Sequence, residues 1–273
     1  MEVVNQIQRE YDPAHPNYKR WQKARDISDQ RAEFVHELLS QKFSIENLLI
    51  LDIGAGEGST SKLFSNNNFV VSLEPKSERI KKIAGSSSLK PLMADCLNIP
   101  FRKSTFDLII LQDVLEHLSV DQKLIEELNN ILKVNGIIYL STPNKLSLFN
   151  IISDPHWGIP LLCLFRREQI KKYFLKYFRK KDFSRPDIAE LLSLQKLVDL
   201  FENDFVITIN TKYSTRHLVN DGKGLVWSGF HLRLIKLLKF FGLSRIILKI
   251  TNDNIGLINK YFTPTFYIIL ARK

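Results

Sequence analysis

Cysteine is scarce in this 273-residue sequence, with only Cys96 and Cys163 present. Two thiols are too few for a disulfide framework, so we expect a reducing compartment. The opening residues, MEVVNQIQREYD, lack a basic stretch followed by an apolar core, and we expect no secretory signal. Uninterrupted apolar runs are also lacking, because the best candidate, Leu146–Phe165, contains an acid, two prolines and a glycine. Such a run breaks as a helix, so the sequence predicts no membrane span.

Acidic residues are outnumbered by basic ones, which leaves a formal net charge of +10. A nucleic acid, an anionic membrane surface or an acidic substrate would each account for this excess, and so would a general need for solubility. The charge is uneven, because Lys and Arg crowd the stretch Lys171–Lys181 and the tail from Arg233 carries little acid. This distribution favours a surface-binding role.

One stretch, LLILDIGAGEGST at residues 48–60, organises the rest of the sequence. An apolar run bounded by glycines, as in Leu48–Asp52, is typical of a strand buried on both faces of a parallel sheet. The glycines at 54, 56 and 58 allow a tight turn and a close approach of the backbone to a ligand. Similar apolar runs then alternate with polar helical patterns as far as Pro143, which predicts a doubly wound α/β fold.

A glycine turn of this kind is compatible with more than one ligand. Glu74 ends the second predicted strand about 20 residues after Asp52, the spacing at which an acid bonds a ribose hydroxyl. Dinucleotide sites require G-x-G-x-x-G, whereas here the third glycine comes early and Glu57 inside the turn would repel a phosphate. A P-loop is excluded because no Gly-Lys-Ser/Thr follows. The pattern favours a nucleoside without a phosphate.

The motifs from residue 47 to about 145 resemble, in order, those of the class I S-adenosylmethionine-dependent methyltransferases. LDIGAGEG resembles the first motif and SLEP the second. ADCLNIPFRKSTFDLIILQDVLEHL resembles the third and fourth, and LKVNGIIYLSTPN the fifth. Within the family the chain most resembles the small-molecule group with ubiquinone-type and sugar O-methyltransferases. The resemblance implies a seven-stranded, mostly parallel sheet with the last strand antiparallel, and residues 204–213 and 264–273 can supply its remaining strands.

S-adenosylmethionine is the methyl donor that the resemblance implies. Its methionine part would lie against Asp52 and the backbone of Gly54 and Gly56. Its ribose would bond Glu74 after the second strand, and its adenine would contact Asp95 and Cys96 after the third. Its sulfonium would face Gln112 and Asp113, just past the fourth strand. Any one of these acids could be a strand-end cap, but three in register favour the cofactor site.

Methylation of an alcohol or phenol requires loss of a proton, so a base near the methyl is expected. His117 in DVLEHL and His156 in SDPHWG follow the fourth and fifth predicted strands, and imidazole suits this task. Either could instead be structural, His117 through a hydrogen bond in its loop and His156 through packing beside Trp157. Asp113, Glu116 and His117 form a D-x-x-E-H cluster that could hold a divalent ion, but we predict no metal.

Three regions are expected. Residues 1–47 form an N-terminal helical lid or a helix packed across the sheet, with Tyr18, Trp21 or Arg25 able to reach a ligand. Residues 48–213 and 264–273 form the core. Residues 214–263 form a helical insertion, apolar and basic together, that is either a lid or an element on a membrane surface.

The sequence says least about the methyl acceptor. QDVL at residues 112–115 departs from the D/N/S-P-P-Y/F motif common in nucleobase N-methylation, and STPN followed by DPHWGIPLL resembles members acting on sugars or lipid-borne intermediates. We expect a cytoplasmic enzyme, peripheral at most to the inner membrane face, that methylates an oxygen of a small or lipid-linked acceptor such as a glycan sugar. The alternatives are a quinone-type phenol, an RNA, or a cofactor-binding scaffold without catalysis.

Overall fold

The computed structural model describes residues 10–83, 85–94, 99–118, 122–185, 187–220, 222, 224–226 and 229–273 of the chain. Its strands are β1 (Leu49–Ile53), β2 (Phe69–Leu73), β3 (Leu89–Leu92), β4 (Phe106–Gln112), β5 (Leu132–Pro143), β6 (Phe205–Ile209) and β7 (Thr265–Arg272). The helices of the first half are α2 (Tyr18–Asp26), α3 (Ser28–Ser40), α4 (Ser59–Phe64), α5 (Ser77–Ile80), the short η1 (Leu115–His117) and α6 (Gln122–Ile131).

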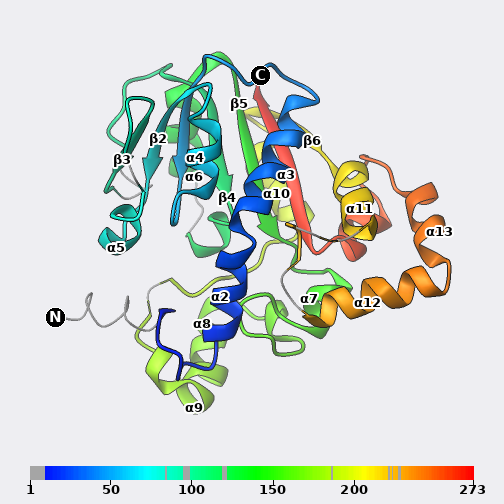
Figure 1. Cartoon of the computed structure of the whole chain (residues 1–273). Coiled ribbons are helices and arrows are strands. Elements are labelled where there is room, and N and C mark those ends of the chain that lie inside the picture. Colours follow the sequence, from blue (N-terminus) through cyan, green and yellow to red (C-terminus); the bar gives the residue numbers. More distant parts are fainter. Residues whose placement is uncertain are drawn as a thin grey trace.

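The second half of the chain is mainly helical (Figure 1). Short elements come first: α7 (Leu148–Ile152), η2 (Leu162–Leu164), α8 (Arg167–Gln169), the π-helical η3 (Ile170–Leu175), α9 (Lys176–Phe178) and η4 (Lys180–Asp182). Longer helices follow: α10 (Leu194–Phe201), α11 (Thr211–Asn220), α12 (Gly229–Phe240), α13 (Leu243–Ile250) and the π-helical η5 (Ile258–Phe262). Among the described residues no helix combines the length and apolarity needed to cross a bilayer.

The strands form one seven-stranded sheet in the order β3-β2-β1-β4-β5-β7-β6. All neighbouring pairs are parallel except those of β7, which runs antiparallel to both β5 and β6. This arrangement confirms the predicted fold class. The chain leaves β1 toward β2 and β3 and then crosses to β4 on the other side, so the carboxyl ends of β1 and β4 flank a switch point where α/β sheets bind ligands.

Helices cover both faces of the sheet because its central strands are apolar on both sides. In β4, Ile109 and Leu111 pack on α6 and α10, whereas Leu108 and Ile110 pack on the opposite layer. That second layer contains buried side chains of α3, α4, α11 and α12: Phe34, Val35, Leu38, Leu39, Phe64, Leu218 and Ile235. The cofactor-side edge of the sheet is thus held between two closely packed helical layers.

Two helical regions differ from the sequence expectation. The sequence pattern of Ile188–Glu202 predicts a helix, but α10 begins only at Leu194, because the Ser193 side chain accepts a hydrogen bond from Lys196 N (3.3 Å) as its N-cap. Leu192 before it instead bridges Asn144 in parallel. The helices between β6 and β7 begin at Thr211, slightly before the expected insertion.

Residues 18–40 divide into two helices with different surroundings. α3 packs into the core through its apolar stripe, and none of the residues of α2 is buried. Trp21 and Arg25 of α2 line the cavity described below, whereas Tyr18 does not contribute to its wall. The packed helix and the ligand-facing helix were expected as alternatives, and the structure contains one of each.

Candidate active site

A cavity of about 780 Å³ lies at the carboxyl ends of β1, β2 and β4. Its wall comes from the loops after these strands, from α2, from the start of α3, and from residues around 155–157 and 185–189. The size is in the range of small-ligand sites, and the position is the switch point of the sheet.

The glycine turn after β1 forms one end of the cavity. Gly54 (φ +69°) and Gly56 (φ +60°) adopt the left-handed conformation that disfavours side chains. A Cβ at Gly54 would come within 2.6 Å of Val114 Cγ2, so this glycine allows the turn to pack on the loop after β4. A Cβ at Gly56 would meet no atom within 4 Å, so its backbone is open for a ligand to approach.

Asp52, near the end of β1, is buried and lines the cavity beside the turn. Its Oδ2 accepts a hydrogen bond from Ser61 Oγ (2.5 Å), and Ser61 Oγ accepts one from Ser72 Oγ (2.7 Å). Burial raises the pKa of Asp52 to about 7, with the Ser61 hydrogen bond opposing this shift and the Glu74 charge adding to it. The Asp52 carboxyl therefore anchors α4 to the sheet edge from which the glycine turn emerges.

Glu74 directly follows β2 and lies against the same turn. Its Oε2 accepts a hydrogen bond from Gly56 N (3.0 Å) and its Oε1 one from Lys76 N (3.0 Å). Each carboxylate oxygen has a second lone-pair site, so both can also accept a ribose hydroxyl. The acid predicted for the ribose and the turn predicted for the methionine part are thus joined by a direct hydrogen bond.

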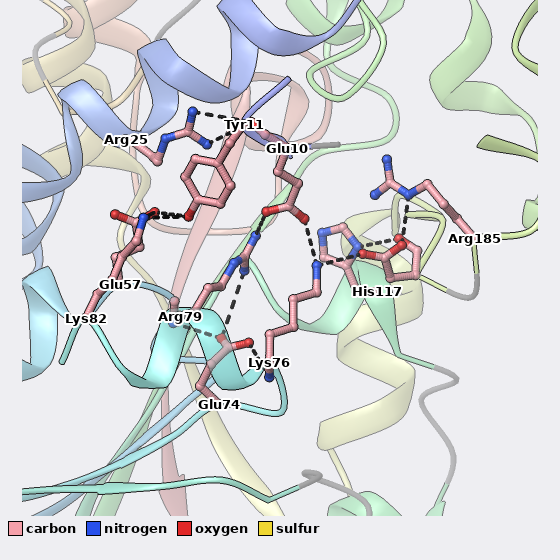
Figure 2. A network of polar contacts seen from close by, with 12 residues as sticks. Glu10, Tyr11, Arg25, Glu57, Glu74, Lys76, Arg79, Lys82, His117 and Arg185 are labelled. Atoms are coloured by element: carbon pink, nitrogen blue, oxygen red, sulfur yellow. Dashed lines mark hydrogen bonds and ion pairs between the residues drawn. The ribbon is translucent and has the colours of Figure 1, made fainter. Parts of the chain in front are cut away.

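Glu10 and Tyr11, which belong to no recognisable motif, lie over the glycine turn and the loop after β2 (Figure 2). Glu10 pairs with Lys76 (2.7 Å) and Arg79 (2.5 Å), which follow Glu74. Tyr11 donates a hydrogen bond to Glu57 (2.5 Å), which also pairs with Lys82 (3.0 Å). Glu57, expected to repel a phosphate, is therefore occupied by neighbouring side chains. No local pattern signals a contact between segments so far apart in the chain.

The predicted sulfonium-side residues end β4. Gln112 Oε1 accepts a hydrogen bond from Thr60 Oγ1 (2.8 Å), which ties β4 to the start of α4. Asp113 adopts a left-handed conformation (φ +54°), forms an ion pair with Arg31 of α3, and accepts a hydrogen bond from Ser141 Oγ (3.1 Å). Both residues line the cavity. Asp95 and Cys96, predicted for the adenine, lie outside the described residues.

The two predicted base candidates lie together. The rings of His117 and His156 are 5.2 Å apart, and His156 Nε2 is 4.0 Å from Glu116 Oε1. Glu116 accepts a hydrogen bond from Thr142 Oγ1 (2.9 Å) through Oε2, while its buried Oε1 has no hydrogen-bond partner among the described residues. Glu116, His117 and His156 each offer a ligand atom within 4.8 Å of the others, so this cluster, which differs from the D-x-x-E-H set, could hold a metal ion.

Burial sets the charge of this cluster. It lowers the pKa of His117, and it lowers the pKa of His156 well below the usual range with the His117 charge adding to the effect. Burial also raises the pKa of Glu116, helped by the Asp113 charge. The imidazoles are therefore neutral at neutral pH. His117 lies 3.0 Å from the carbonyl of Asp187 through Nδ1, and since a carbonyl only accepts, Nδ1 carries the proton and Nε2 the lone pair.

Aromatic and cationic side chains form another part of the cavity wall. Trp21 stacks on His15 (ring centroids 4.5 Å), and the Arg185 guanidinium lies 5.6 Å from the Trp21 ring and 5.9 Å from the Trp157 ring. Trp157 Nε1 is buried with no partner among the described residues. Arg185 and Asp187 follow an irregular stretch whose sequence carries no motif, and only the fold shows that they belong to the site.

The part of the chain that holds the cavity is similar to known proteins. Residues 51–140, from β1 through most of β5, match a methyltransferase domain model. Two uncharacterized proteins of Methanocaldococcus jannaschii are 29% and 28% identical over 123 and 130 residues, which are 42% and 48% of this chain. The chain matches 53% and 59% of those proteins, or somewhat over half of their length.

Solved structures share the fold over most of the chain. A putative S-adenosylmethionine-dependent methyltransferase from Listeria monocytogenes superimposes with a TM-score of 0.55 at 12% identity, over 89% of this chain and 98% of that protein. A methyltransferase from Thermotoga maritima, described as a possible histamine N-methyltransferase, gives 0.54 at 12% identity, over 100% and 97%.

These similarities agree with the local geometry. The matched domain model spans the glycine turn, Glu74 and the end of β4, the same elements that surround the cavity. The sheet order and the antiparallel β7 are those expected of the family. Residues 51–140 therefore form a methyltransferase domain, on a fold shared with S-adenosylmethionine-dependent methyltransferases, which supports S-adenosylmethionine as the methyl donor.

Proposed function

We propose that the chain methylates an oxygen atom of a small or lipid-linked acceptor, with a sugar of a surface glycan as the first candidate. The observation that carries this proposal is the cluster of Glu116, His117 and His156 beside Asp113 in the cavity. The enzyme would act in the cytoplasm, at or near the inner face of the membrane.

The cluster supplies what an oxygen nucleophile needs. Bound S-adenosylmethionine carries the methyl on a positively charged sulfur, and transfer leaves S-adenosylhomocysteine with the S–C electron pair. The acceptor O–H proton would pass to His117 Nε2, whose lone pair is free because Nδ1–H donates to Asp187 O. A lowered pKa keeps this imidazole neutral and ready to accept. His156 and the cavity wall would hold the acceptor in line with the methyl.

The aromatic part of the cavity wall supports a sugar as the acceptor. Trp21 and Trp157 line the cavity, and Trp157 Nε1, which has no hydrogen-bond partner among the described residues, can donate to a hydroxyl. Arg20 places positive charge in the same wall, where a phosphate of a lipid carrier could be neutralised, whereas Arg185 is already paired with Asp182 and Asp187. A quinone-type phenol would use the same base and the same aromatic faces, so it is the second candidate.

Radioactive methyl transfer distinguishes the acceptors. Purified protein is incubated with methyl-labelled S-adenosylmethionine and, separately, a polyprenyl-phosphate-linked sugar, a hydroxylated quinone and total tRNA. We expect label in the lipid-linked sugar, with mass fragmentation placing the methyl on oxygen. Label confined to the quinone would support the second candidate, and label confined to tRNA would contradict the proposal.

Histidine variants test the base. His117→Asn should lower kcat by roughly 10²- to 10⁴-fold, the range for loss of a general base, while leaving the Kd for S-adenosylmethionine unchanged. His36→Asn, in α3 and outside the cavity wall, is the matched control. An unchanged kcat in His117→Asn would assign that residue a structural role.

A further inference from the structure

Exposed apolar side chains gather on the hairpin of α12 and α13. α12 buries only His231 and Ile235, and α13 buries no residue. Phe240 is 83% exposed and Phe241 63%, and the exposed set continues with Phe230, Leu237, Leu243, Ile246 and Ile250. Scattered exposed apolar residues are ordinary, but a contiguous group of this kind marks an interaction surface.

The charge of this hairpin has one sign. Between residues 222 and 252 the sequence contains no Asp or Glu. Within the two helices the basic residues are Arg233, Lys236, Lys239, Arg245 and Lys249. An apolar face combined with Lys and Arg and no acid is the composition of helices that lie in a membrane interface. We call this surface the α12–α13 patch.

A second surface of the same composition covers α8 through η4. Tyr173, Tyr177, Phe178 and Phe183 are exposed there, 72% in the case of Phe178. The Lys-rich stretch Lys171–Lys181 runs between them, with Lys172 Nζ 5.0 Å from the Tyr173 ring. This region contains two acids, Glu168, which is exposed on α8, and Asp182, which is buried against His15. We call this surface the α9 patch.

The α9 patch and the α12 part of the α12–α13 patch lie at the same end of the molecule, while α13 runs beside α11 (Figure 1). Figure 1 shows α7, α8, α9 and α12 beyond the carboxyl ends of β1, β2 and β4, the end at which the cavity lies. Residues 148–165 connect the two patches. His231 of α12 donates a hydrogen bond to the Phe149 carbonyl of α7 (2.8 Å), and Trp157 packs on Phe174 of η3. Leu148, Ile152, Leu161 and Phe165 on this bridging segment are exposed as well.

We propose that this end of the protein docks on an anionic lipid bilayer through the α12–α13 patch and the α9 patch. Lys and Arg match anionic headgroups, and the Phe, Leu and Ile side chains match the acyl boundary. A second copy of the chain would bring basic surface against basic surface, which disfavours a symmetric contact. Nucleic-acid binding would not account for the exposed Leu and Ile side chains, because they have no ring on which a base can stack.

The docking extends the proposed function, because it would place the cavity at the membrane surface where a lipid-linked acceptor resides. The docking itself does not depend on catalysis. Binding to vesicles without methylation of the lipid-linked sugar would support the membrane-docking surface and contradict the lipid-linked sugar as acceptor. Methylation in detergent without vesicle binding would support that acceptor and contradict the docking surface.

The test is flotation of the full chain with vesicles of phosphatidylcholine containing phosphatidylglycerol, against vesicles of phosphatidylcholine alone. We expect binding to the anionic vesicles that falls steeply as salt rises from about 0.1 to about 0.5 M. The double variant Phe240→Ser and Phe241→Ser should reduce partitioning at least about 10-fold. The variant Lys236→Gln, Lys239→Gln and Arg245→Gln should remove the preference for anionic vesicles.

Matched controls separate this surface from general effects. Val134→Ser with Val206→Ser changes two exposed apolar residues near the starts of β5 and β6 and should leave partitioning unchanged. An unaltered Kd for S-adenosylmethionine shows that each variant is folded. Wild-type protein that stays with the unbound fraction would overturn the proposal. A wild-type dimer that becomes a monomer in the Phe240 and Phe241 variant would assign the patch to a second copy.

Discussion

Glu74 connects the loop after β2 to the glycine turn after β1. It follows β2 directly, accepts a hydrogen bond from Gly56 N, and lies 3.9 Å from Arg79. The neighbouring acid, Asp52, is buried and accepts a hydrogen bond from Ser61 Oγ. Both acids line the cavity, and Asp52 in addition ties α4 to the end of β1.

Glu74→Ala is expected to weaken S-adenosylmethionine binding by about 10-fold or more in isothermal titration. Hydrogen bonds to a charged group contribute about 1.5–3 kcal/mol, and the variant also loses the bond that positions Gly56. Glu46→Ala, an exposed acid in the loop before β1, is the control and should bind as wild type does. Equal affinity in both variants would show that the ribose lies elsewhere.

At the scale of elements, the N-terminal segment and α2 complete a site whose core begins only at β1. α3 packs against the sheet, and α2 continues from it along the cavity. Glu10 then joins the segment to the β2–α5 loop through Lys76 and Arg79. Opposite charges at this contact lower the pKa of Glu10 to about 2 even though burial alone would raise it.

Glu10→Gln should lower the free energy of unfolding by up to about 3 kcal/mol at neutral pH, the equivalent of a pKa lowered from 4.5 to about 2. Because the folded pKa lies below the unfolded one, this stability is present above about pH 4.5 and is lost as the pH falls toward 2. Urea unfolding of both proteins should therefore show a constant difference from pH 8 to 5 that narrows below. Glu33→Gln, exposed on α3, is the control.

At the scale of the whole molecule, helical additions gather at one end of the sheet. Residues 144–192 and the helices α11 to α13 surround the carboxyl edge, and the described acids of this end are mostly paired. Most of the excess of Lys and Arg over Asp and Glu lies within residues 144–192 and 211–263 of the sequence. A basic surface would also suit an RNA-binding protein, so an experiment is needed to distinguish binding of the methyl donor from binding of RNA.

Thermal unfolding separates a donor-binding enzyme from a nucleic-acid binder. S-adenosylmethionine at 100 times its Kd should stabilise the fold by about 2.7 kcal/mol, which corresponds to a rise in Tm of about 5 °C for a chain of this size. Total tRNA at the same mass should leave Tm unchanged, and nuclease treatment should not alter purification behaviour. A larger shift with tRNA than with the methyl donor would favour the RNA alternative.

The sequence by itself determined the sheet class and the methyltransferase domain, and it predicted acids at the cavity edge, of which Asp52 and Glu74 line the cavity and Asp95 lies outside the described residues. These depend on local patterns: an apolar strand, a glycine turn, and acids at the ends of successive strands, which parallel pairing brings to one edge. The tertiary structure alone decided which distant groups meet. Glu10 reaches Arg79, His156 reaches Glu116, and Asp187 orients His117. The gathering of the α9 patch and α12 at the cavity end was likewise decided by packing, since contacts between segments far apart in the chain leave no period in the sequence.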